Sequence, residues 1–140
     1  MDGSALAFAS PQMRHPALRN PPRCLHCGRR TKRALCSPHN ENGNCYRPYY
    51  ACYNCGEFAC FGDMRGVVAE NPACFCDDGM QISRRAIAGV GSGETRIPWS
   101  KFYQCATGGC PFFGYMTDEH DQILIYSGIV TQELLTSLGF

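Results

Sequence analysis

The sequence lacks the features that mark several large classes of protein. No stretch approaches the ~20 consecutive apolar residues of a membrane span. The opening segment from Met1 to Ala9 is short, mildly apolar and has no basic residues, so it does not resemble a secretory signal. We therefore expect no membrane association and an intracellular, reducing environment. There is also no glycine-rich phosphate-binding motif, no βαβ pattern and no evident grouping of nucleophile, base and carboxylate, so we expect neither an enzyme nor a small-molecule substrate.

Aliphatic residues are also scarce, above all between Arg14 and Val67. Such a stretch cannot bury enough apolar surface to fold unaided, and small domains of this kind need a staple. The chain has 140 residues and 11 cysteines, an odd number that argues against a fully paired disulfide framework. Structural zinc is the alternative, because its binding free energy of about 10–16 kcal/mol per ion becomes folding free energy.

Two cysteine pairs have the form of zinc knuckles. Cys24 and Cys27 are followed by Gly28, and Cys52 and Cys55 are followed by Gly56. A two-residue spacer lets both sulfurs reach one ion, and two knuckles complete a tetrahedron. Glycine can take a positive φ, so the chain can turn back and direct backbone N–H groups at the thiolates. The sequence predicts a first site made of Cys24, Cys27, Cys52 and Cys55.

Two alternatives remain open for this site. His26 stands between the first two cysteines and could replace Cys27, since imidazole also ligates zinc. Cys60 could replace Cys55, which would give a wider second pair. A redox dithiol or a set of disulfides is a further interpretation of the same cysteines.

A second, similar pattern follows the first. Both contain an aromatic doublet with a cysteine two residues after it, at Tyr49-Tyr50-Ala-Cys52 and at Phe102-Tyr103-Gln-Cys105. The second copy predicts a zinc site with the four ligands Cys74, Cys76, Cys105 and Cys110. Three cysteines are then left over as small apolar or surface residues, namely Cys36, Cys45 and Cys60.

These patterns predict a small, metal-stabilised, mainly β protein of two tandem zinc ribbons built from short antiparallel strands. We expect the aromatic runs and Ile123–Tyr126 to be strands. A short helix is expected from Thr131 to Leu138, with Thr131 as its N-cap. The predicted divisions are a disordered, proline-rich arm at 1–22, a first ribbon at 23–66, a second ribbon at 67–118 and a C-terminal element at 119–140 that packs on the second ribbon. Gly89–Gly93 is predicted to be a flexible loop.

The sequence resembles the GRF-type zinc finger family, and most closely the tandem GRF-like zinc ribbons of fungal proteins. The motifs that carry the resemblance are Arg47-Pro-Tyr-Tyr-Ala-Cys52, Asp63-Met-Arg-Gly66, Asn71-Pro-Ala-Cys-Phe-Cys76 and Cys110-Pro-Phe-Phe-Gly-Tyr115. The resemblance implies a zinc-ribbon fold, a grip on single-stranded nucleic acid and residence in the nucleus. Where the family has a Gly-Arg step, this chain has Tyr46-Arg47 in the first copy and Trp99-Ser100 in the second.

Charge is divided unevenly along the chain, and this bears on the partner. Residues 1–50 carry eight Lys or Arg and two Asp or Glu, whereas residues 51–140 carry five and ten. A cationic surface with exposed rings is typical of sites for single-stranded nucleic acid. The candidate contacts are Arg29, Arg30, Lys32, Arg33, Arg47, Tyr49, Lys101 and Phe102. In the alternative interpretation the protein is a structural or protein-interaction module, in which Arg29, Arg30, Arg47 and Lys101 balance the negative charge of the zinc thiolates.

Overall fold

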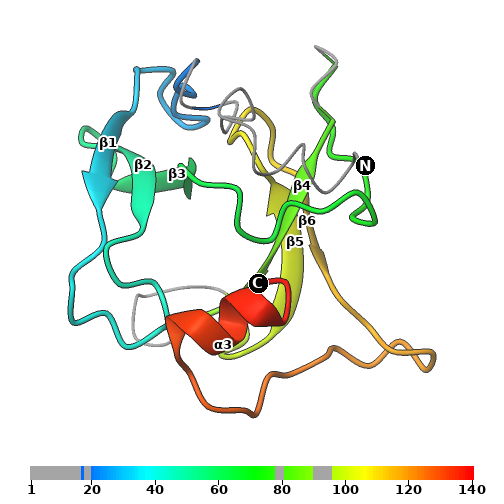
Figure 1. Ribbon diagram of the computed structural model, residues 1–140. Coiled ribbons are helices and arrows are strands. Elements are labelled where there is room, and N and C mark those ends of the chain that lie inside the picture. The colour runs from blue at the N-terminus through cyan, green and yellow to red at the C-terminus, as the bar shows by residue number, and fades with distance from the viewer. Residues whose placement is uncertain (1–16, 18–19, 78–80, 90–95) are drawn as a thin grey trace, which may run out of the picture.

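The computed structural model describes residue 17 and residues 20–77, 81–89 and 96–140. Within these residues, six short strands form two sheets, and a short helix lies near the C-terminal end (Figure 1). The prediction of a mainly β protein with two small antiparallel ribbons is confirmed. The strands are β1 (Lys32–Leu35), β2 (Pro48–Cys52), β3 (Glu57–Phe61), β4 (Ser83–Ile87), β5 (Lys101–Cys105) and β6 (Phe113–Tyr115), and the helix is α3 (Gln132–Ser137).

The first ribbon is an antiparallel sheet in the order β1-β2-β3. The predicted aromatic run forms its central strand, in which Tyr50 is buried and pairs with Arg33 on one side and Cys60 on the other. A bulge falls between Tyr50 and Ala51, so that Ala59 has no partner across the ladder. The small core of this ribbon contains Tyr50, Cys60 and Ala17.

The second ribbon repeats this arrangement in the order β4-β5-β6. Its central strand again carries an aromatic doublet and ends at a cysteine, Cys105. Phe102 is buried there with Ala86 and Ala88, and Phe113 packs against them. The sequence patterning missed β4 because its letters, Ser-Arg-Arg-Ala-Ile, do not alternate as a half-buried strand should.

The repeat extends to single residues. Ala51 pairs with Phe58 in the first sheet and Gln104 pairs with Phe113 in the second, which makes the two phenylalanines equivalent. Tyr46 and Trp99, each six residues before the cysteine that ends the central strand, have φ of 60° and 64°. This left-handed conformation is unusual for residues other than glycine. The two copies therefore share a glycine-like backbone at the same position relative to the central strand.

The two ribbons are joined by a buried arginine. Arg84 on β4 is fully buried and donates to the backbone oxygens of Phe61, the last residue of β3, and of Asp63 and Arg65, which follow β3. Gly66 lies at the same junction with φ of +77°, and a Cβ there would collide with the backbone oxygen of Arg85. The close approach of the two backbones thus requires glycine, and the ribbons form one unit.

The C-terminal segment contacts both ribbons. Thr131 caps α3 by accepting a hydrogen bond from the Leu134 N–H, as predicted. The side chain of Leu135 is buried and lies over Gly43, in the loop between β1 and β2. Lys101 on β5 places its ammonium 5.6 Å from the centre of the Phe140 ring. The segment therefore contacts the first ribbon as well as the second.

The predicted strand at Ile123–Tyr126 is wrong. The segment makes only two isolated bridges, Thr117 with Ile123 and Ser100 with Ile125. Leu124 donates to Met116 and accepts from Lys101, so its hydrogen bonds are divided between two partners. No continuous ladder with one neighbour can form in this way.

Two other predictions fall largely outside the described residues. Of the proposed N-terminal arm only residues 17 and 20–22 are described, and of the proposed loop at 89–93 only Gly89 is. Within the described part of the chain, no helix is long and apolar enough to span a bilayer.

Candidate zinc centres and basic surface

The first cysteine group lies at one end of the first ribbon. The Sγ atoms of Cys24, Cys27, Cys52 and Cys55 all lie within 4.8 Å of one another. Cys24 and Cys27 come from the turn before β1, whereas Cys52 ends β2 and Cys55 stands in the turn to β3. These are the four sulfurs predicted for the first site. A β-hairpin and a separate turn thus bring two local pairs together.

The knuckle glycines adopt the backbone that the chemistry needs. Gly28 and Gly56 have φ of +77° and +73°. The turns direct backbone N–H groups toward the sulfurs. The backbone N–H of His26 donates to the Cys24 Sγ, with the nitrogen 3.4 Å from the sulfur. A hydrogen bond from the backbone N–H of Arg29 lowers the pKa of Cys27 to about 6, because it stabilises the thiolate. The hydrogen bond between Cys55 and Cys27 raises the pKa of Cys55 to about 12.

The second group lies at the corresponding end of the second ribbon. The Sγ atoms of Cys74, Cys76, Cys105 and Cys110 are also within 4.8 Å of one another. The Phe75 N–H donates to the Cys110 sulfur at 3.2 Å, and the Cys76 N–H donates to the Cys74 sulfur at 3.5 Å. Burial alone would raise the pKa of Cys105, but hydrogen bonds from Thr107, the Cys110 backbone and Cys76 together outweigh it and lower the pKa to about 6. Despite its tighter Cys-x-Cys opening, this group matches the first in ligand type and number.

Each group has the donor set of a structural zinc site. Four thiolates in mutual contact are the ligands of a closed tetrahedral Zn²⁺ site, in which the metal contributes to folding. The two groups can each hold one zinc ion, as the sequence predicted. The cysteines form no disulfide, and all of them lie in described residues. Backbone N–H groups and the side chains of Asn54 and Thr107 contact the sulfurs.

The residues that were alternatives for zinc lie elsewhere. Cys60 is fully buried beside Tyr50 and belongs to neither sulfur group, and burial raises its pKa to about 12. The side chain of His26 is exposed and is likewise outside both groups. Cys36 and Cys45 are partly exposed in the loop region between β1 and β2.

Fold and sulfur geometry together define a protein of two zinc ribbons. Residues 21–65, which span the first ribbon, match the model of a family described as the GRF-like zinc ribbon domain. The second ribbon lies outside this match but has the same strand order and the same four-cysteine arrangement. No curated protein and no solved structure matches the chain.

The candidate nucleic-acid contacts divide into two sets. Arg29, Arg30, Lys32 and Arg33 are all exposed on or just before β1, an edge strand of the first sheet. We call these four residues the basic edge. Arg47 and Phe102 are buried, with 6% and 5% of their surface exposed, and cannot reach a partner in this conformation.

The remaining two candidates, Tyr49 and Lys101, each already contact an aromatic ring of the protein. Tyr49 stacks on Phe58 with ring centres 5.9 Å apart, and Lys101 lies over the Phe140 ring.

Arg47 forms two hydrogen bonds to the Asp63 carboxylate, at 2.8 and 3.1 Å, and its guanidinium lies 3.5 Å from the centre of the Phe61 ring. The arginine of the Gly-Arg step is therefore part of the protein interior.

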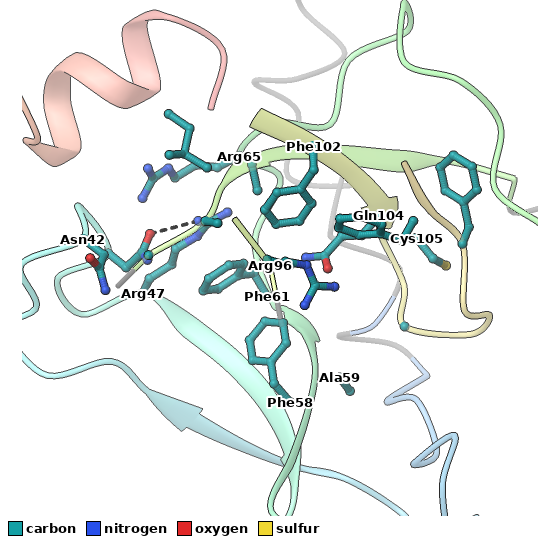
Figure 2. A pocket seen from close by; sticks show the side chains of 18 of the residues that line it. Asn42, Arg47, Phe58, Ala59, Phe61, Arg65, Arg96, Phe102, Gln104 and Cys105 are labelled. Carbon is teal, nitrogen blue, oxygen red and sulfur yellow. Dashed lines mark hydrogen bonds between the residues drawn. The ribbon is translucent and has the colours of Figure 1, made fainter. Parts of the chain in front are cut away.

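A cavity of about 670 Å³ lies between the two ribbons, and sequence reasoning did not find it. Figure 2 shows that its walls carry Phe58 and Phe61 from the first ribbon and Phe102, Gln104 and Cys105 from the second. Arg96 also lines it, with its guanidinium 4.5 Å from the centre of the Phe113 ring. The equivalence of Phe58 and Phe113 in the two cysteine-x-x-phenylalanine segments is the one sequence signal that could have pointed to it.

Proposed function

We propose that this protein is a non-catalytic module that binds single-stranded nucleic acid through the basic edge of its first ribbon. The observation that carries the proposal is the clustering of four exposed cations at residues 29, 30, 32 and 33 along one sheet edge. Phosphate contacts by such side chains release counterions and supply most of non-specific affinity. The nuclear residence implied by the family resemblance is consistent with this partner.

The surroundings of the basic edge favour a polyanion. Between residues 20 and 60 the only carboxylates are Glu41 and Glu57. Lys32 lies 5.8 Å from the centre of the Tyr53 ring, and 67% of Tyr53 is exposed. A cation and an accessible ring side by side are the elements with which proteins hold unpaired nucleotides. The zinc groups support a non-catalytic role, because four sulfurs leave no open coordination position for a reaction.

The salt dependence of binding tests this proposal. We expect the log of the affinity for an oligothymidine to fall with log salt at a slope of about −3 if all four side chains contact phosphates. The variant Arg29→Ala/Arg30→Ala/Arg33→Ala should bind more weakly and flatten the slope by about 2. Fluorescence anisotropy at about 50–200 mM salt measures both.

A charge-preserving control separates electrostatics from folding. Arg29→Lys/Arg30→Lys/Arg33→Lys keeps every cation and should keep the slope, and all variants should keep two zinc ions per chain. An unchanged slope in the alanine variant would refute the role of the basic edge. Equal affinity for polyglutamate would indicate a general preference for acidic polymers and an acidic protein partner instead.

A further inference from the structure

The cavity between the ribbons has the size and lining of a ligand site. Its volume of about 670 Å³ falls within the range of about 300–1,000 Å³ that is usual for pockets that hold small molecules. Both ribbons contribute an equivalent phenylalanine to its walls, Phe58 from β3 and Phe113 from β6. Because both ribbons line the cavity, a single ribbon would not possess it.

Phe58 offers a ring for stacking. Although it lies in a core-forming strand, 45% of its surface is exposed. One neighbour, Tyr49, stacks on it, and Phe61 meets it edge-on at 5.0 Å. The rest of the ring remains accessible. Its equivalent Phe113 instead lies under the guanidinium of Arg96, so the two sides of the cavity differ.

Gln104 adds a polar group to this aromatic lining. It occupies the position of Ala51 in the first ribbon, lies on the central strand β5 and is half-buried. Its side-chain amide makes no hydrogen bond to any residue that the structure describes. One amide carries both a donor and an acceptor, and paired donor and acceptor groups are what a nucleobase edge presents.

The charge of the lining matches a nucleotide. Arg47, Arg65 and Arg96 line the cavity, whereas Glu57 is the one acidic side chain among the lining residues that the structure describes. Arg47 is already paired with Asp63, and Arg65 donates to the backbone oxygens of Gly43 and Phe140. Leu25, four residues before Arg29, lines the cavity too, so one end of it adjoins the turn that leads to the basic edge.

We infer that the cavity between the ribbons receives an unpaired nucleobase, which stacks on Phe58 and presents its edge to Gln104. The inference rests on the proposed function, since the basic edge would hold the phosphates of the same strand. Phosphate contacts act on any polyanion, whereas the cavity would distinguish a strand that has bases from one that lacks them. Base stacking on an aromatic side chain tolerates any base, and the amide would add a modest preference among them.

The test compares a normal strand with an abasic one. Anisotropy titrations use an oligothymidine, an oligoadenosine and an abasic backbone of about 16 nucleotides each. Wild-type protein should bind the two normal strands at least about tenfold more tightly than the abasic strand, because each stacked base contributes about 1–3 kcal/mol. Phe58→Ala should remove most of that difference and leave the abasic affinity and the salt slope unchanged, while Phe58→Tyr should restore it.

The Gln104 amide is tested separately. Gln104→Leu keeps the volume and removes the hydrogen-bonding groups, so it should narrow the difference between oligoadenosine and oligothymidine without changing the salt slope. Retention of two zinc ions per chain and of the unfolding midpoint shows that each variant is folded. An unaltered midpoint is expected for Phe58→Tyr and Gln104→Leu.

The outcomes separate this inference from the proposed function. Absence of salt-dependent binding to any strand would refute both. Salt-dependent binding by the wild type with equal affinity for normal and abasic strands would leave the basic edge in place and overturn the base site. The base site is likewise overturned if a zinc-loaded Phe58→Ala variant binds all three strands as the wild type does.

Discussion

The Arg84 guanidinium lies 3.0 Å from the Asp63 carboxylate, and Arg47, which belongs to the same ribbon as Asp63, binds this carboxylate as well. Arg84 belongs to β4 of the second ribbon, whereas Asp63 follows β3 of the first. One carboxylate thus pairs with two buried arginines, and the cluster keeps a net charge of +1. Without it, two cations would lie in a largely apolar junction, where an unpaired charge is very costly.

We therefore expect Arg84→Met to uncouple the ribbons. The change keeps an unbranched, flexible side chain but removes the guanidinium, and so leaves the backbone oxygens of Phe61, Asp63 and Arg65 without their donor. Breaking a buried ion pair in this way costs about 3–5 kcal/mol of unfolding free energy. Denaturation of the zinc-loaded protein, followed by the fluorescence of Trp99 in the second ribbon, measures it. Arg30→Met, on the exposed edge, should stay within about 0.5 kcal/mol of wild type, and equal losses in the two variants would contradict the role of Arg84.

Zinc content should distinguish the ligand cysteines from the others. Cys52 is 1% exposed and its Sγ lies 3.6 Å from that of Cys27, so Cys52→Ser should remove one zinc and unfold the first ribbon. The reason is that zinc binding contributes about 10–16 kcal/mol to the folding of such sites. Cys36→Ser, outside both sulfur groups, should keep two zinc ions and nearly wild-type stability. Elemental analysis under reducing conditions decides this, and one zinc in the Cys36 variant would disprove the assignment.

The ion pairs of Asp63 also predict a pH dependence. Burial by itself would raise the pKa of Asp63, but Arg47 and Arg84 hold it below the ordinary value of 3.8. The folded pKa is thus lower than the unfolded one. The stabilisation is complete above pH 3.8 and is lost as the pH falls through the folded pKa.

Carbon NMR of the Asp63 carboxyl group measures this titration directly. Zinc release, which thiol protonation also promotes in acid, is followed in parallel with a chromogenic chelator. A midpoint below 3.8 while zinc is still bound agrees with the ion pairs. A midpoint at or above that value would contradict them.

Tyr46 is expected to tolerate glycine unusually well. Its φ of 60° costs a residue with a side chain about 1–2 kcal/mol. Tyr46→Gly relieves this cost and loses about 0.5–1 kcal/mol to chain entropy, so the net effect should be a small stabilisation. The exposed Tyr53 serves as the control, because Tyr53→Gly should destabilise the protein. Thermal unfolding of the zinc-loaded variants measures both, and destabilisation by Tyr46→Gly would show that its ring, 66% exposed, contributes more than its backbone costs.

The sequence by itself determined the parts of this protein that depend on neighbours along the chain. The cysteine spacing, with glycine after each knuckle, predicted the four sulfurs of the first group because a two-residue spacer and a positive φ are local properties. The aromatic doublets predicted β2 and β5, and Thr131 predicted the start of α3, for the same reason.

Only the tertiary structure decided what the charged and aromatic side chains do. Arg47 and Lys32 are both cations in or beside a strand of the first ribbon. Arg47 is buried against Asp63, whereas Lys32 is exposed beside Tyr53. Arg84 stands in a polar stretch of the sequence, but it is the most deeply buried large side chain of the junction. The fate of a cation depends on whether a distant carboxylate and several carbonyl oxygens replace its water. Those partners come together only when the two ribbons pack, and the cavity beside them arises in the same step.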